Sequence, residues 1–414
     1  MILRSRVVLP ISQPPIEDGA VLISGNRIAR VGPWKDFSAS EGDSVTDLGD
    51  VILMPGLINA HCHLDYTDMA GLIPPQKSFT DWIRLMLSTK AGWNYSEYAE
   101  SWIAGAKMLL RTGTTTVVDF EAVPELIPDV WSATPLRVVS LLEMTGVKTR
   151  RDPRAILQDN IGHILTLPGG RCRPGLAPHA PYSTVPELLR LAAEASRKRH
   201  WPISIHVAES AQEFDMFTKG RGLMYQWLKR NGRDLSDCRL GSPVHLLNRA
   251  GVLGGNCIAV HVNYLADGDA RLLAGKKTSV AHCPRSHFYF QHAPFPFEKL
   301  AGAKVNICLG TDSLATVYKK PKQKVELSLF AEMQTFAADH PETPPEKILR
   351  MATINGARAL GLAEQCGELS ESALADVIAI PFAGALRDAN EAVVNHDGNI
   401  IASMIDGEWA ISPK

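Results

Sequence analysis

Residues 55–65, Pro-Gly-Leu-Ile-Asn-Ala-His-Cys-His-Leu-Asp, carry the strongest structural signal in the chain. Proline and glycine mark the start of a new element, and the apolar run behind them predicts a buried strand. Side chains two apart in a strand share a face, so His61 and His63 should point the same way. Cys62 between them should face away as a small core residue. Two imidazoles on one face are able to bind one metal ion.

From this segment to about residue 362, apolar strand-like segments alternate with helical patterns. Eight segments have the pattern of strands: residues 57–61, 114–120, 136–144, 175–179, 203–206, 258–262, 278–282 and 305–309. Helical patterns between them include residues 97–110, 186–198, 298–300 and 325–338. Eight such repeats predict an α/β fold, a (β/α)8 TIM barrel. An open doubly wound sheet is the alternative, but no GxGxxG motif follows any of these strands.

Both ends of the chain show short alternating apolar runs broken by glycine and asparagine, which is the pattern of hairpins. These runs are residues 6–10, 20–23, 27–31 and 51–54 at one end, and 375–380, 391–394, 400–405 and 408–411 at the other. We therefore predict a small composite β-sandwich domain made of residues 1–54 and 363–414. It would flank a barrel domain of residues 55–362.

Composition excludes several classes of partner. The 414 residues are 45% hydrophobic and 21% charged with a net charge of −1, so no overall field attracts nucleic acid or an anionic membrane. The apolar runs fall short of the roughly 18 residues that cross a bilayer, and the start lacks the apolar core of a signal peptide. The seven cysteines form no CxxC pair, which is typical of reduced thiols. We expect a cytoplasmic protein that binds neither nucleic acid nor membrane, and a homo-oligomer is left open.

Further candidate ligands follow other predicted strands. Catalytic groups of a barrel collect at the carboxyl ends of its strands, where His206 ends the fifth strand and Asp312 follows the eighth. With His61 and His63 they form a set suited to one divalent ion, zinc or ferrous iron, with a position left open for water. Such an ion lowers the pKa of the water to about 7 and so supplies hydroxide at neutral pH.

Glu209, three residues beyond His206, is the candidate acid/base group. His261 ends the sixth predicted strand and is placed to orient the water or to hydrogen-bond the leaving group, and Asp312 can also accept a proton. Each of these three residues, taken singly, also has a purely structural interpretation. His261 would be a core histidine, Asp312 a helix N-cap and Glu209 a surface charge. Their joint occurrence at strand ends favours the metal site.

Five motifs resemble the amidohydrolase superfamily, in its branch of metal-dependent deaminases and chlorohydrolases that act on aminated heterocycles. They are residues 55–63, Ala-Pro-His179-Ala-Pro-Tyr182-Ser, His206-Val-Ala-Glu209-Ser, His282-Cys-Pro-Arg285-Ser and Leu-Gly-Thr-Asp312-Ser. The resemblance implies a single metal held by His61, His63, His206 and Asp312, with Glu209 and His261 assisting. No lysine ends the fourth predicted strand, where a binuclear relative would carry a bridging carbamate, so one metal is favoured.

Within that branch, residues 78–83 and Leu142-Glu143-Met-Thr-Gly146 are similar to enzymes that deaminate adenine-bearing nucleosides such as aminodeoxyfutalosine. This implies a hydrolytic deaminase in which metal-activated hydroxide replaces an exocyclic amine and ammonia departs, while Glu209 protonates the ring nitrogen. A chlorohydrolase or cyclic-amide hydrolase of the same superfamily is the alternative. A non-catalytic scaffold is disfavoured because the whole ligand set is present. The chain departs from the pattern at His287, where relatives usually have asparagine.

A further set of residues is expected to bind the substrate: His179, Tyr182, Trp82, Glu143, Arg285 and Lys319. The first two would meet sugar hydroxyls. Arg285 and Lys319 follow the seventh and eighth predicted strands, so both should overhang the barrel mouth and pair with a carboxylate tail. The alternatives are core packing for Trp82, a structural brace for Arg285 and a solvated side chain for Lys319, within a lysine-rich loop of residues 319–324.

Overall fold

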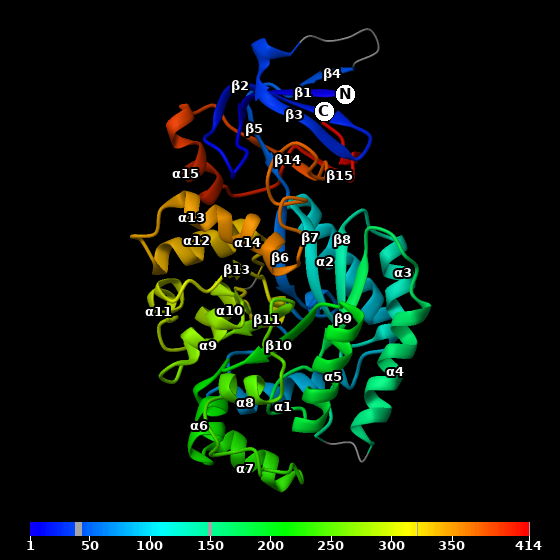
Figure 1. Ribbon diagram of the computed structural model, residues 1–414, viewed down its shortest axis with the longest axis vertical. Coiled ribbons are helices and arrows are strands. Elements are labelled where there is room, and N and C mark those ends of the chain that lie inside the picture. The colour runs from blue at the N-terminus through cyan, green and yellow to red at the C-terminus, as the bar shows by residue number, and fades with distance from the viewer. Residues whose placement is uncertain (38–43, 148–150, 321, 414) are drawn as a thin grey trace.

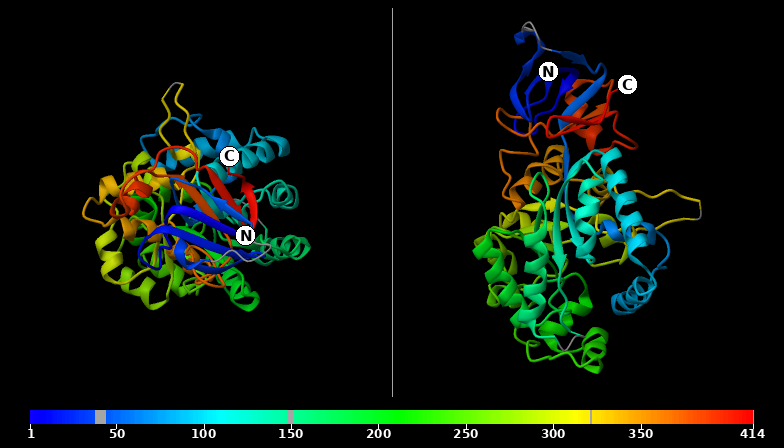
Figure 2. Two further views of the ribbon diagram at one scale, coloured as in Figure 1. Left: turned by 90° about the horizontal axis from the view of Figure 1, so that it is seen from above. Right: turned by 90° about the vertical axis from the view of Figure 1, so that its right-hand side faces the viewer.

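The structure is a computed structural model that describes residues 1–37, 44–147, 151–320 and 322–413. It consists of a barrel and, at one end of the barrel, a separate sheet to which both ends of the chain contribute (Figure 1). Both termini lie on this separate sheet (Figure 2). Among the described helices, none combines the length and the apolar character that a membrane crossing requires.

Eight parallel strands follow one another round the barrel in chain order, as counted over the described ranges. They are β6 (Leu57–Cys62), β7 (Thr114–Glu121), β8 (Arg137–Glu143), β9 (Arg173–Ala177), β10 (Ile203–Val207), β11 (Cys257–His261), β12 (Ser279–His282) and β13 (Ile307–Leu309). The ring closes where the amides of Thr311 and Asp312 both donate to the carbonyl of His61. The predicted TIM barrel is confirmed, and each of its eight predicted strands has an observed counterpart.

Gly310 permits this closure. A Cβ at residue 310 would lie 2.8–2.9 Å from the backbone and Cβ of His61, closer than such atoms approach in folded proteins. The missing side chain therefore lets the end of β13 lie directly against β6. That contact joins the first and last strands at the level of the predicted metal ligands.

Helices surround the barrel and pack their apolar faces on its strands. They are α1 (Phe79–Lys90), α2 (Tyr95–Arg111), α3 (Ile127–Ser132), α4 (Pro153–Thr166), α5 (Pro186–Arg199), α6 (Ala211–Lys219), α7 (Leu223–Arg230), α8 (Pro243–Arg249), α9 (Asp269–Gly275), α10 (Pro284–Tyr289), α11 (Phe297–Gly302), α12 (Leu329–Asp339), α13 (Pro345–Met351) and α14 (Ile354–Ala359). Short 3-10 turns are η1 (Trp34–Asp36), η2 (Leu64–Met69), η3 (Pro124–Leu126), η4 (Leu314–Thr316) and η5 (Leu386–Asp388).

Side-chain caps explain where several of these helices begin. Asn94 accepts from the amides of Ser96 and Glu97, and the Glu97 carboxylate accepts from the amide of Asn94, which is a capping box at the start of α2. The predicted helix of residues 325–338 begins only at Leu329, because the side chain of Ser328 caps it there. A cap of this kind, more than hydrophobic periodicity, decides the first residue of a helix.

The separate sheet combines strands from both chain ends. They are β1 (Ile2–Val8), β2 (Ile16–Ser24), β3 (Arg27–Pro33), β4 (Val45–Asp47), β5 (Val51–Pro55), β14 (Val377–Pro381), β15 (Ala402–Ile405) and β16 (Glu408–Ile411). Their order is β16-β15-β14-β5-β1-β2-β3, with β4 beside β1, and β5 pairs antiparallel with β14. The prediction that both ends form one β-unit is confirmed. The domain limits at residues 54/55 and 362/363 stay a prediction.

One predicted strand is wrong. Residues 391–394 belong to a helix, α15 (Ala389–Val394), and not to a hairpin. Ala389, Val393 and Val394 are buried, and α15 packs beside α12 and α13. A short apolar run does not distinguish strand from helix, and here the neighbouring helices supply the surface that buries it.

The direction of β6 sets where the site lies. Because β6 continues directly from β5 of the separate sheet, its amino end is next to that sheet and its carboxyl end is distant from it. Helices α1, α6 and α7 cover the barrel on this distant side (Figure 1). The carboxyl ends of the strands therefore open under α1 and α7.

Candidate active site

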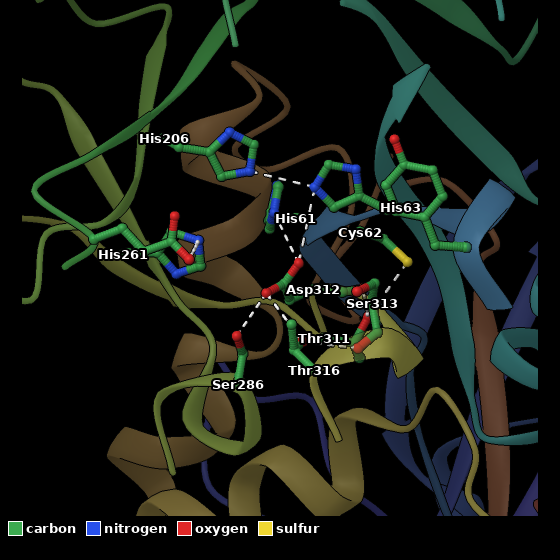
Figure 3. Close-up of polar contacts among 12 residues, drawn as sticks. His61, Cys62, His63, His206, His261, Ser286, Thr311, Asp312, Ser313 and Thr316 are labelled. Carbon is green, nitrogen blue, oxygen red and sulfur yellow. Dashed lines mark hydrogen bonds and ion pairs between the residues drawn. The ribbon is translucent and has the colours of Figure 1, made fainter. Parts of the chain in front are cut away.

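The four predicted metal ligands converge at the carboxyl ends of the strands (Figure 3). His61 and His63 come from the end of β6, His206 from β10 and Asp312 from the segment after β13. The ligand nitrogens of the three histidines all lie within 4.8 Å of one another. Asp312 Oδ1 lies 3.6 Å from His61 Nε2 and 3.8 Å from His63 Nε2. Three distant parts of the sequence thus meet at one point.

The imidazoles of this cluster lack the partners that buried ring nitrogens normally have. Among the described residues, both nitrogens of His61 and Nδ1 of His63 have no hydrogen-bond partner. Nε2 of His63 and Nε2 of His206 face each other at 3.3 Å. His206 donates from Nδ1 to the carbonyl of His179 at 2.9 Å, which leaves its Nε2 as a lone pair directed at the cluster.

The pKa values of the clustered histidines are consistent with their use as metal ligands. Burial lowers the pKa of both His63 and His206 well below its usual value, so the two rings are neutral and their lone pairs are free to bind a cation. Neutral imidazoles with a carboxylate are the ligands that zinc and ferrous iron prefer. The cluster therefore fits one divalent metal ion.

Asp312 is the fixed anion of the cluster. Its φ of 51° lies in the left-handed region, which non-glycine residues seldom adopt. Ser286 donates to Oδ2 at 2.6 Å and Thr316 at 3.2 Å, so the other oxygen faces the histidines. Burial opposes ionisation, but the neighbouring imidazoles of His61, His261 and His63 hold the pKa of Asp312 below its usual value. Asp312 caps no helix, because Ser313 is the N-cap residue of η4.

Glu209 and His261 form a second buried pair beside the cluster. His261 Nε2 lies 3.6 Å from Glu209 Oε1, and the two residues are 3% and 6% exposed. Burial, with the negative charges of Asp312 and Glu213, raises the pKa of Glu209 well above its usual value. Burial lowers the pKa of His261 to about 3. The raised pKa of Glu209 favours its protonated carboxyl and the lowered pKa of His261 favours its neutral imidazole, a combination that suits proton transfer.

A cavity of about 210 Å³ opens beside these groups. Its polar lining includes Lys90, Glu143, Thr145, His179, Tyr182, Ser183, Glu209, His261 and Asp312. Its apolar wall comes from α1 and α7: Phe79, Trp82, Ile83, Met86, Leu87, Trp227 and Leu228. The cavity thus has a chemically active end at the strands and an apolar cover formed by helices.

Four of the predicted substrate-binding residues line this cavity, namely Trp82, Glu143, His179 and Tyr182. His179 Nδ1 lies 2.6 Å from the hydroxyl of Ser183, which holds the ring in place. Trp82 stacks with Phe79, with ring centroids 6.0 Å apart. Trp82 therefore both packs within the apolar wall and contributes to the cavity surface, so its two interpretations are compatible.

The structure does not bring Arg285 and Lys319 to the cavity. Arg285 donates from Nε to Glu332 Oε1 at 2.5 Å, and its amide donates to Glu332 Oε2 at 2.9 Å. The Lys319 ammonium donates to the carbonyl of Ala70 at 3.3 Å on the protein surface. Neither residue lines the cavity, so the structure does not support the predicted pairing with a carboxylate tail. Pro321, within the lysine-rich loop, lies outside the described residues.

Sequence reasoning missed several groups near the site. Lys90 on α1 contacts the hydroxyl of Tyr66, whose ring stacks on His63 with centroids 5.2 Å apart. Glu213 on α6 is fully buried behind Glu209. Ser210 and Glu213 have the Ser-x-x-Glu spacing of a helix start, and this is the signal that would have suggested the latter residue. Lys90 follows no strand, so no strand-end argument identifies it.

Comparison with known proteins agrees with this geometry. Residues 52–410 match the amidohydrolase family. The chain is 29% identical over 393 residues to the 5-methylthioadenosine/S-adenosylhomocysteine deaminase of Moorella thermoacetica, which covers 92% of this chain and 85% of that protein.

Two solved structures share the fold. An adenosine deaminase from Xanthomonas campestris with bound zinc has a TM-score of 0.83 at 23% identity and covers 99% of this chain and 92% of its own. The aminofutalosine deaminase of Helicobacter pylori has a TM-score of 0.87 at 19% identity and covers 99% of each chain. The chain belongs to the amidohydrolase family and is a hydrolase that acts on carbon–nitrogen bonds.

Proposed function

We propose that the protein is a hydrolytic deaminase that replaces the exocyclic amine of an adenine-type nucleoside with oxygen and releases ammonia. One observation carries the proposal: the histidine cluster and the buried carboxyl of Glu209 meet at the same end of one cavity. The similarity to a deaminase of methylthioadenosine and S-adenosylhomocysteine supports the choice of base.

His61, His63, His206 and Asp312 would hold the metal ion. We propose zinc, because three imidazoles and one carboxylate suit it, and the Xanthomonas campestris structure contains it. When bound, such an ion lowers the pKa of a water molecule to about 7. The carboxylate of Asp312 stays ionised beside the cluster, since its pKa lies below the usual value.

The remaining steps belong to Glu209 and His261. The Glu209 carboxyl carries a proton to the ring nitrogen next to the carbon that bears the amine, which makes that carbon easier to attack. The oxygen of water forms the new bond to this carbon, and the carbon–nitrogen bond to the amine breaks. One proton of the water leaves with the amine as ammonia, and the other returns to the Glu209 carboxylate. His261, neutral and 3.6 Å from Glu209, hydrogen-bonds the attacking water and orients it.

The apolar wall of the cavity bears on which group the nucleoside substrate carries at the 5′ position of its sugar. Side chains such as Phe79, Met86 and Leu228 cover the cavity away from the strands. A carboxylate set against them would lose its hydration, and Lys90, the lysine that lines the cavity, is already in contact with the Tyr66 hydroxyl. A thioether or another uncharged group would instead bury apolar surface. His179 and Tyr182 would meet the sugar hydroxyls. We therefore propose an adenine nucleoside with an apolar group at the 5′ position, in preference to a carboxylate-bearing nucleoside such as aminodeoxyfutalosine.

Ammonium release by the purified protein tests the proposal. Adenosine, 5′-methylthioadenosine and a carboxylate-bearing adenine nucleoside should be compared, with a chlorinated triazine and a cyclic amide as substrates of the alternative reactions. We expect kcat/KM for the thioether to exceed that for the carboxylate by about tenfold or more, the range that apolar pocket contacts give. Chloride release or ring opening without any ammonium from a nucleoside would contradict the proposal.

A further inference from the structure

The main chain at Glu209 makes an unusual bend. Ala208, directly before it, has a φ of 51°, in the left-handed region that non-glycine residues seldom adopt. Such strain persists only where the surrounding structure enforces it, and it occurs often at functional sites. The bend takes the chain out of β10 and places the Glu209 carboxyl 3.6 Å from His261.

Glu213 holds the amide side of this bend. Its Oε1 accepts from the amide of Ala208 at 3.0 Å, and its Oε2 accepts from the amide of Glu209 at 2.9 Å. Glu213 is fully buried in the first turn of α6, where its own amide donates to Ser210 Oγ at 3.1 Å. One carboxylate that binds two successive amides dictates how the two peptide planes are oriented.

Asn263 holds the carbonyl side. Its side-chain nitrogen donates to the carbonyl of Glu209 at 2.9 Å, and its Oδ1 faces Nδ1 of His287 at 3.1 Å. An amide oxygen only accepts, so His287 is the donor in this contact, and it sets which way the Asn263 amide faces. Asn263 is 4% exposed and follows His261 and Val262, which also have positive φ values of 72° and 51°.

We propose that Glu213 and Asn263 form a clamp on the main chain of Glu209, and that His287 completes the clamp by orienting Asn263. These three are positioning residues, because none of them bonds to the reacting groups. The clamp rests on the proposed role of Glu209 in proton transfer. A displacement of a reacting group by about 1 Å lowers turnover about a hundredfold, so the clamp makes a measurable difference to kcat.

Isosteric variants separate positioning from folding. In Glu213→Gln an NH2 group replaces one accepting oxygen and faces a backbone N–H, so the bend relaxes. We expect kcat to fall about 10–100-fold, with KM changed less than about threefold and metal content unchanged. His287→Leu should lower kcat in the same direction, whereas His287→Asn keeps a donor for Asn263 and should retain most of the activity.

Asp269→Asn is the matched control. Asp269 is also a fully buried carboxylate, and it accepts from Ser242 Oγ at 2.7 Å and from the amide of Ala266 at 2.8 Å, away from the cavity. It should lower thermal stability as Glu213→Gln does, without a comparable fall in kcat. Equal kcat in the two variants, or equal activity of His287→Leu and His287→Asn, would overturn the clamp.

Crystal structures of the wild type and Glu213→Gln provide a readout that needs no substrate. The Glu209 carboxyl should move by more than about 0.5 Å, the tolerance within which catalytic groups must be held. An unmoved carboxyl overturns the clamp whatever the substrate is. A wild type that releases no ammonium from any nucleoside, with the carboxyl displaced in the variant, overturns the proposed function and leaves the clamp in place.

Discussion

The pKa values of two buried carboxyls in the same cavity are shifted in opposite directions, because their neighbours differ. The imidazoles beside Asp312 overcome the effect of burial and hold its pKa below the usual value, whereas burial, with the negative charges of Asp312 and Glu213, raises the pKa of Glu209. Titratable groups whose pKa values are pushed apart often divide acid and base roles, which supports the proposed roles of Asp312 as the anion and Glu209 as the proton carrier.

Variants of His206 and Glu209 should separate metal binding from proton transfer. His206→Ala should abolish both bound metal and activity, because it removes one of the three clustered imidazoles. Glu209→Gln should keep its metal while turnover falls about a hundredfold to ten-thousandfold, the usual loss for an acid/base group. Metal analysis and ammonium release measure the two effects, with His163→Ala, at a half-buried histidine of α4 that does not line the cavity, as the control that changes neither. Full activity of His206→Ala, or metal loss in Glu209→Gln, would refute these roles.

At the scale of elements, the contact between the first and last barrel strands brings together the proposed metal ligands. The amides of Thr311 and Asp312 donate to the carbonyl of His61, and the amide of His63 donates to the carbonyl of Asp312 at 3.3 Å. The backbone bonds that close the barrel therefore also set the spacing of three ligands. Anything that separates β6 from the end of β13 should disturb the site.

Gly310→Ala tests this coupling. The added methyl would meet His61 atoms at 2.8–2.9 Å, and overpacking of this kind costs about 1–3 kcal/mol. We expect a lower melting temperature together with weaker metal binding. Gly162→Ala is the matched control: nothing lies within 4 Å of its added Cβ in α4, so it should stabilise the protein by roughly 0.5–1 kcal/mol. Unchanged metal affinity in Gly310→Ala would show that barrel closure and the site are independent.

At the scale of the molecule, a buried ion pair joins the barrel to the sheet of the chain ends. Arg137 at the start of β8 donates to both carboxylate oxygens of Asp376, at 3.1 and 3.2 Å, and to Asp406 at 3.4 Å. The side chains of Arg137 and Asp376 are 9% and 2% exposed. Asp376 directly precedes β14, so the pair links the C-terminal strands to the barrel.

Arg137→Met should destabilise the whole protein. It leaves the Asp376 carboxylate buried without its partner, a change that costs about 3–5 kcal/mol. Arg190→Met removes the exposed pairs with Glu187 and Glu194 and should cost less than about 1 kcal/mol. Urea denaturation, followed by both tryptophan fluorescence and activity, compares the two. Similar midpoints for both variants would mean that the buried pair does not hold the two parts together.

The local sequence pattern was sufficient to predict the barrel strands and the candidate catalytic residues at their ends. The alternation of apolar segments predicted the eight barrel strands, and the polar residues that end them included every ligand of the cluster. This works because parallel strands place their carboxyl ends at one face of a barrel, so position along a strand already implies proximity. The same reasoning failed at residues 391–394, where neighbouring helices decided the conformation.

Only the tertiary structure decided which charges face the cavity. Arg285 follows a barrel strand as the predicted metal ligands do, yet its guanidinium binds Glu332 on α12. Lys90 follows no strand, yet α1 folds over the barrel and brings it to the cavity. The clamp on Glu209 likewise depends on side chains from α6, from the segment after β11 and from α10 that come together only in the folded chain. Side-chain partners are long-range contacts, and strand and helix periodicity contains no information about them.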